Sequence, residues 1–204
     1  LDNSRTLSEQ GMFVSAETML NQSTLPYLDK IHNEIVNDMK CSSHEVHPMY
    51  PADFASQLNE LSLKEMKDAI NHLLDIRDED IWMLFGTLPI YPCINDKNDQ
   101  KLLQRLRDAK NVTMRNDPDG RSRLNVNVFT GNVIVTDFGD ENGTISNIQK
   151  DKLTDVFDQW LDSELAKSLN CHCPKYQCLG PNVLVKNMYY PKTDFKHKEK
   201  EMHA

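Results

Sequence analysis

An almost uninterrupted apolar run, Ile81 to Leu88 (IWMLFGTL), restricts the fold of this chain more than any other segment. Strands that are buried on both faces have this pattern, as parallel strands beneath helices do. Two more strands are predicted upstream, at residues 11–20 and 44–51. Amphipathic helices are predicted between the three strands, at residues 25–39 and 58–77. This alternation of strands and helices predicts an α/β fold.

Three parallel strands form only a fragment of a doubly wound sheet or a barrel, and exposed strand edges favour aggregation. Residues 1–92 are therefore interpreted as half of a larger domain. The chain begins Leu1-Asp2-Asn3-Ser4, with no initiator Met, no basic segment and no apolar segment. We therefore expect no secretory signal, a cytoplasmic location, and a chain that is a piece of a longer protein.

The charge of the chain disfavours two classes of partner. The 204 residues include 23 Lys and Arg against 31 Asp and Glu, for a net charge of −8. Nucleic-acid binding depends mostly on Lys and Arg contacts to phosphates, so no nucleic-acid partner is expected. No segment approaches the roughly 18 consecutive apolar residues of a membrane helix, so no membrane partner is expected either.

The sequence after residue 92 has a different pattern of predicted elements. A charged helix is predicted at residues 100–109, a β-hairpin at 124–137 and an amphipathic helix at 151–169. These elements predict a small α+β subdomain over residues 93–191. Residues 192–204 are rich in Lys, His and Glu and are predicted to be a flexible tail.

Three cysteines lie within eight residues, in the pattern Cys171-x-Cys173-x4-Cys178. The chain has five cysteines, and an odd number without a secretory signal disfavours a disulfide framework. Thiolates select zinc or iron–sulfur clusters. Zinc sites usually contain Cys-x2–4-Cys pairs, so this spacing fits a [4Fe-4S] cluster better, with a fourth ligand from elsewhere. The alternative is three buried free thiols, which the polar flanking residues disfavour.

The two remaining cysteines are interpreted differently. Cys93 lies just beyond the buried strand, where chain ends of an α/β unit converge, and is the best candidate for the fourth ligand. Its alternative is an ordinary loop cysteine. Cys41 lies at a helix–strand junction and is interpreted as structural.

Several segments together resemble a known family. The steps GNVI and SNI, a helix with Phe157 and Trp160, and a cysteine cluster before Leu179-Gly180-Pro181 resemble the SPASM or twitch auxiliary-cluster region of radical S-adenosylmethionine (SAM) proteins. The segments HPMYP, WMLFGTLP, RNDPDG, NVFTGNVIVTDFGD and CLGPNVLVK resemble the YfkAB group of that family, named for its CxCxxxxC motif. The resemblance covers nearly the whole chain, to about Pro191.

The resemblance implies that residues 1–92 are the C-terminal half of a radical SAM partial barrel and that residues 93–191 are a SPASM/twitch-like subdomain. The CxxxCxxC motif that holds the SAM cluster is absent from the chain. The chain would then be the C-terminal portion of a radical SAM enzyme and catalytically incomplete by itself. Its auxiliary [4Fe-4S] cluster would serve electron transfer or substrate anchoring. SAM and a second cluster would belong to the full-length parent, and the partner would be the N-terminal half or a separate SAM-binding chain.

The resemblance also implies cofactor contacts. Ala16-Glu17-Thr18 matches a strand position that contacts SAM in the family, so Ser15 or Glu17 would reach its ribose or methionyl group. The alternative is that both residues face solvent or a helix. His44 and His47 are predicted on opposite faces of one strand, which disfavours a metal site there. His47 would line the substrate cavity or be structural.

The hairpin departs from the family pattern. Many SPASM hairpins end in Pro-Cys, where this chain has Val135-Thr136-Asp137. Asp137 would then ligate through oxygen, Cys93 would complete the site, or one iron would stay open. Two other functions remain as alternatives: a zinc-stabilised protein-binding module, and an electron-relay subunit that works beside a separate SAM-binding chain.

Overall fold

The computed structural model describes residues 1–49, 55, 57–88, 90, 96–115, 125–134 and 144–162. The chain divides into two compact units, Leu1–Arg115 and Asn116–Ala204. A domain boundary was predicted after residue 92, but the first unit extends beyond it. One further strand joins its sheet, and one further helix precedes that strand.

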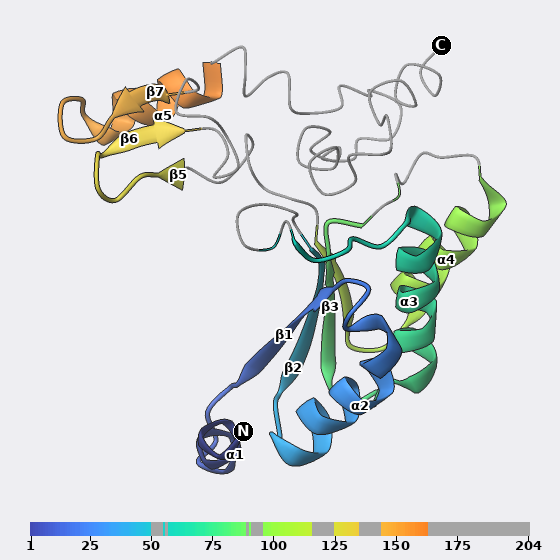
Figure 1. Ribbon diagram of the computed structural model, residues 1–204. Helices are drawn as coiled ribbons and strands as arrows, with labels where there is room; N and C mark the ends of the chain where they lie inside the picture. Colours follow the sequence, from blue (N-terminus) through green and yellow to red (C-terminus); the bar gives the residue numbers. More distant parts are fainter. Residues whose placement is uncertain are drawn as a thin grey trace. The chain divides into compact units, whose positions relative to one another are not determined.

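The first unit alternates helices with parallel strands. Its elements are α1 (Asp2–Glu9), β1 (Ser15–Leu20), the 3-10 turn η1 (Leu25–Tyr27), α2 (Leu28–Asn33), the π-helical turn η2 (Glu34–Asp38), β2 (Ser43–Pro48), α3 (Leu63–Ile76), β3 (Trp82–Gly86), α4 (Lys97–Asp108) and β4 (Val112–Arg115). The strand order is β1-β2-β3-β4, the same as the chain order, and each neighbouring pair is parallel. Figure 1 shows α2, α3 and α4 on one side of this sheet. In barrels, too, neighbouring strands follow one another in chain order. In doubly wound sheets, by contrast, the strand order reverses at one point of the sheet.

The predicted apolar strand is β3, but its two faces are not equally buried. Met83 and Phe85 are fully buried beneath the helices, whereas Trp82 is 48% exposed. The prediction of burial on both faces is therefore wrong at Trp82. An apolar run by itself does not show whether both faces of a strand are covered or one face is partly exposed.

The predicted helix at residues 25–39 is divided into η1, α2 and η2. Pro26 lies in the first turn. The last turn widens because the amide of Met39 donates to the carbonyl of Glu34, five residues earlier, at 2.8 Å. The predicted second helix is α3, which starts with a capping box between Ser62 and Glu65. Burial between the helices and the sheet forms the core of the unit, with Leu20, Val46, Ile70, Leu73, Met83, Phe85 and Leu106 almost inaccessible to solvent.

The described part of the second unit contains β5 (Asn125–Val126), β6 (Asn132–Ile134), β7 (Thr144–Asn147) and α5 (Leu153–Asp162). The three strands form an antiparallel sheet in the order β5-β6-β7. The β5–β6 pair is the predicted hairpin, whereas β7 was not predicted. Val133, Val156 and Trp160 are fully buried and form the core of this unit. In the described ranges, no helix combines the length and apolar character needed to cross a membrane.

Candidate functional site

One side of the parallel sheet carries polar side chains, and none of the helices in the described residues packs against it. Side chains alternate along a strand, and Thr18 and His44 are buried on the side of α2. Their neighbours in β1 and β2 therefore lie on the opposite side, which we call the helix-free face. Its polar residues on these two strands are Ser15, Glu17, Ser43, Glu45 and His47.

Hydroxyl groups hold one carboxylate of this face in place. Ser15 and Ser43 are register partners, and the Ser43 hydroxyl donates to Ser15 Oγ at 2.6 Å. The Ser15 hydroxyl in turn donates to Oε1 of Glu45 at 3.1 Å. Ser15 therefore positions a carboxylate of the neighbouring strand.

The imidazole of His47 lies beside two carboxylates. Its Nε2 is 3.6 Å from Oε2 of Glu45 and 4.0 Å from Oε1 of Glu17. Glu17 and Glu45 are direct register partners, and like charges that face each other across strands destabilise a sheet. A donor or a positive charge between them, from His47 or from a ligand, offsets this repulsion. The Glu17 side chain is 55% exposed and thus accessible to such a ligand.

Gly86 makes room for the His47 ring. A Cβ atom at Gly86 would lie 2.3 Å from Nδ1 of His47, far inside van der Waals contact. The ring therefore covers the bare backbone of β3, at the carboxyl end of the strand. Further along the same face, the indole NH of Trp82 donates to Oγ1 of Thr113 at 2.8 Å.

The opposite side of β2 holds a buried histidine pair. His44 is fully buried, and its Nε2 lies 2.9 Å from Oγ1 of Thr18. Burial, with a smaller contribution from His32, lowers the pKa of His44 to about 3. The prediction that His44 and His47 face opposite sides is confirmed, because His44 contacts His32 of α2 and His47 contacts the carboxylates of the helix-free face.

The predicted cofactor contacts Ser15 and Glu17 come together with Glu45 and His47. Both lie on the helix-free face and neither faces a helix. The proposed cluster ligands Cys93, Cys171, Cys173 and Cys178 lie outside the described residues, as does Asp137.

Cys41 is a buried free thiol, and burial raises its pKa, as expected of a structural cysteine. Within the ranges that the structure describes, no group of three or more His, Cys, Asp and Glu residues is arranged to hold a metal ion.

Ser43 and Glu45 were not predicted as site residues. Their position in the alternating pattern of β2, on the same side as His47, was visible in the sequence. What the sequence did not show is the register that places Ser43 beside Ser15 and Glu45 beside Glu17.

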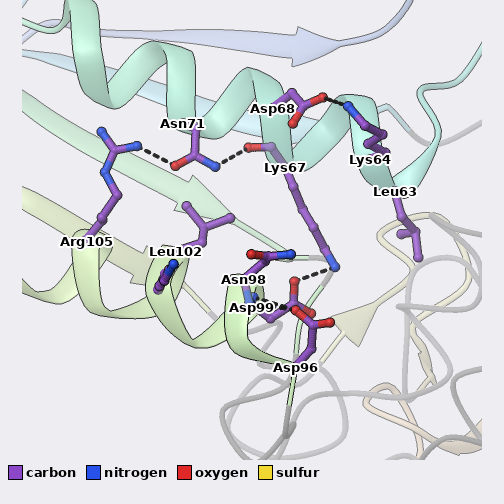
Figure 2. A pocket seen from close by; sticks show the side chains of 11 residues that line it. Leu63, Lys64, Lys67, Asp68, Asn71, Asp96, Asn98, Asp99, Leu102 and Arg105 are labelled. Carbon is purple, nitrogen blue, oxygen red and sulfur yellow. Dashed lines mark hydrogen bonds and ion pairs between the residues drawn. The ribbon is translucent and has the colours of Figure 1, made fainter.

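A cavity of about 640 Å³ lies between α3 and α4. Figure 2 shows Lys67 of α3 reaching toward Asp99 of α4, and the two form an ion pair at 2.6 Å. Arg105 donates to the side chains of Asn71 and Asp75 on α3. These charged groups join the two helices, so the cavity is a weaker candidate for a ligand site than the helix-free face.

Comparisons with known proteins identify two similarities. A family model described as the YfkB-like domain matches residues 49–200. A Bacillus subtilis (strain 168) protein named YfkA is 66% identical over 195 residues, which cover 96% of this chain and 52% of that relative. The chain thus spans about half the length of the curated relative it matches. No solved structure matches the chain.

Proposed function

The chain belongs to the YfkB-like domain family, and we propose that it is the C-terminal, auxiliary-cluster-bearing portion of a radical SAM enzyme. Its predicted place among the YfkAB proteins is confirmed at the level of the family. The radical SAM chemistry, the partial barrel and the SPASM/twitch-like subdomain belong to the proposal.

The polar helix-free face is the observation that carries the proposal. In barrels built from parallel strands, the face without helices is the inner face, and residues near the carboxyl ends of the strands bind ligands. An inner face that served only packing would be apolar. The helix-free face instead carries the linked set Ser15, Glu45, His47 and Glu17. His47 lies near the carboxyl end of β2, next to Gly86 at the carboxyl end of β3.

The hydrogen-bonding groups of this face fit a nucleoside that carries an amino acid group. Carboxylates accept hydrogen bonds from ribose hydroxyls and from ammonium groups, as acidic side chains do in dinucleotide-binding folds. Glu17 is the accessible carboxylate, and Ser15 holds the second one, that of Glu45, in position. In this proposal Glu17 and Ser15 orient SAM, and SAM with its reduced cluster supplies the radical chemistry in the complete enzyme.

The auxiliary cluster belongs to the proposal on the basis of spacing and family resemblance. Cys171, Cys173 and Cys178 would hold a [4Fe-4S] cluster by thiolate ligands, with Cys93 as fourth ligand. The cluster would transfer electrons or anchor the substrate. The N-terminal half of the parent protein, or a separate SAM-binding chain, would supply the remaining strands and the SAM cluster.

Anaerobic reconstitution of the full chain with iron and sulfide tests this function. We expect about four irons per chain and an electron paramagnetic resonance signal after reduction. Cys173→Ala should lose the iron, whereas Cys41→Ala, the matched control, should retain it. One zinc per chain in place of iron would overturn the proposal in favour of a zinc-stabilised binding module. Equal iron in the wild type and in Cys173→Ala would also overturn it.

A further inference from the structure

A second cavity, of about 320 Å³, lies where α2 and η2 meet the end of α3. Asn33 and Asn37 line it from α2 and η2. Arg77 and Asp78, which follow the last residue of α3, line it as well. Small-molecule sites in proteins have volumes from about 300 Å³ upward. Since π-helical turns such as η2 are also frequent at functional sites, the cavity is a candidate site for a small ligand.

The guanidinium of Arg77 has an unsatisfied donor beside this cavity. The side chain is only 10% exposed. Nη1 donates to the carbonyl of Leu74 at 2.8 Å, and Nη2 donates to Oε1 of Glu79 at 3.4 Å. Nε is buried and has no hydrogen-bond partner among the residues that the structure describes. Buried donors are nearly always paired, and the fork of Nε and Nη2 matches the two oxygens of a carboxylate.

The imidazole of His32 lines the same cavity without adding charge to it. Burial lowers the pKa of His32, so the ring is neutral. Its Nε2 accepts from the amide of Asp78, and its Nδ1 contacts His44. The charged side chains of the lining are therefore two carboxylates, Asp29 and Asp78, against the one guanidinium of Arg77. A ligand that matches this lining carries one excess positive charge.

Both carboxylates of the lining keep an oxygen for a ligand. Oδ2 of Asp29 accepts from Nε2 of His72 at 2.8 Å. Oδ1 of Asp78 accepts from the amide of Asp80 at 2.8 Å. The second oxygen of each carboxylate has no partner within the described ranges. The carboxyl end of α3 adds the partial negative charge of a helix terminus, which favours ammonium groups here.

We propose that this cavity binds a free basic amino acid, with its carboxylate on the Nε and Nη2 atoms of Arg77 and its two amino groups on Asp29 and Asp78. One carboxylate and two ammonium groups match the charged groups of the lining in number and in sign. The cavity lies on the helix side of β2, where His32 contacts His44, and the helix-free face lies on the other side. The inference therefore does not rest on the proposed function.

The test is a nuclear magnetic resonance titration of the full chain with L-lysine, observed at the arginine Nε–Hε signals. We expect a saturable shift of the Arg77 signal, with a dissociation constant of about 1 mM or below. Acetate offers the carboxylate alone, and n-butylamine offers an amino group alone. At equal ionic strength each should bind at least about tenfold more weakly than L-lysine.

Variants separate the two ends of the ligand, with binding followed at the amide signals of residues 29–37. Arg77→Lys keeps the charge but removes the fork, so it should weaken L-lysine binding at least about tenfold. Arg107→Lys is the matched control, because Arg107 is exposed on α4 and does not line the cavity. Asp78→Asn keeps the oxygen that accepts from Asp80 and should also weaken binding of L-lysine.

Thermal unfolding shows whether Arg77→Lys still folds, since Arg77 also binds the end of α3. If it does not fold, Asp78→Asn decides the question, because it leaves the Arg77 contacts in place. Three results would overturn the inference: no saturable shift with L-lysine, wild-type affinity in the folded variants of Arg77 and Asp78, or binding of acetate or n-butylamine as tight as that of L-lysine.

Discussion

Nδ1 of His32 lies 3.0 Å from Nδ1 of His44, in the buried layer between α2 and the sheet. The amide of Asp78 donates to Nε2 of His32 at 3.3 Å, so Nδ1 of His32 carries a hydrogen and donates to His44. His44 must then carry its own hydrogen on Nε2, where it donates to Thr18 Oγ1. Both rings are neutral in this arrangement, and a further proton would place two donors against each other.

Acidification should therefore destabilise the first unit. Burial lowers the pKa of His44 from 6.5 to about 3, so between these values the unfolded chain binds a proton at His44 that the folded chain does not. Stability should be complete above the unfolded pKa and fall by up to about 1.4 kcal/mol per pH unit below it. Urea unfolding between about pH 5 and pH 7 measures this slope. His44→Gln should flatten the slope, and the control His72→Gln, an exposed position on α3, should keep it.

A methyl group at Gly86 should displace the His47 ring. The added Cβ would lie 2.3 Å from Nδ1 of His47, so we expect Gly86→Ala to cost about 1–3 kcal/mol of stability, as overpacking does. Proton–nitrogen correlation spectra of the imidazole should show that the ring leaves Glu45. In a His47→Ala background the same substitution should cost much less. Equal costs in both backgrounds would show that the ring does not occupy this space.

The ion pair between Lys67 and Asp99 should contribute strongly to the contact between α3 and α4. The Asp99 side chain is 4% exposed, so Lys67→Met leaves a buried carboxylate without its cation. We expect a loss of about 2–3 kcal/mol in the free energy of unfolding, less than for a fully buried pair because Lys67 is partly exposed. Lys64→Met removes an exposed pair with Asp68 and should cost less than about 1 kcal/mol. Similar losses in the two variants would contradict this assignment.

The second unit should keep its sheet when the proposed cluster is lost. Among the described residues of this unit, Val133, Val156 and Trp160 form a buried core. In Cys173→Ala we expect amides of β6 to remain protected, while exchange accelerates near residues 170–185. Hydrogen exchange with mass spectrometry checks this pattern. Uniform acceleration over residues 121–190 would mean that the cluster organises the whole unit.

Local signals predicted most of the elements of the first unit. The helix predicted at residues 58–77 is α3, but it begins only at Leu63, after the capping box between Ser62 and Glu65. β1 and β3 were predicted from their apolar runs, whereas β2 was predicted as a brief strand that ends at a proline. β4 was missed, since four residues from Val112 to Arg115 carry too little pattern to separate a strand from a loop.

The candidate site could be predicted only in part. Ser15 and Glu17 were selected through family resemblance, and alternation placed His47 opposite His44. The pairing of Glu17 with Glu45 depends on the register of two strands separated by a helix, which local sequence does not encode. The room for His47 depends on Gly86, a residue that the sequence shows only as an interruption of an apolar run.

The coincidence of strand order with chain order has a consequence for how genes for such proteins can be divided. In a sheet with this order, a cut between two helix–strand units separates the polypeptide along a single strand boundary. Each product keeps its own strands contiguous, and no connection has to cross from one product to the other. Fission and fusion at such boundaries therefore change the covalent chain without rearranging the sheet, and separately translated halves can assemble by the same strand pairing that a continuous chain would use.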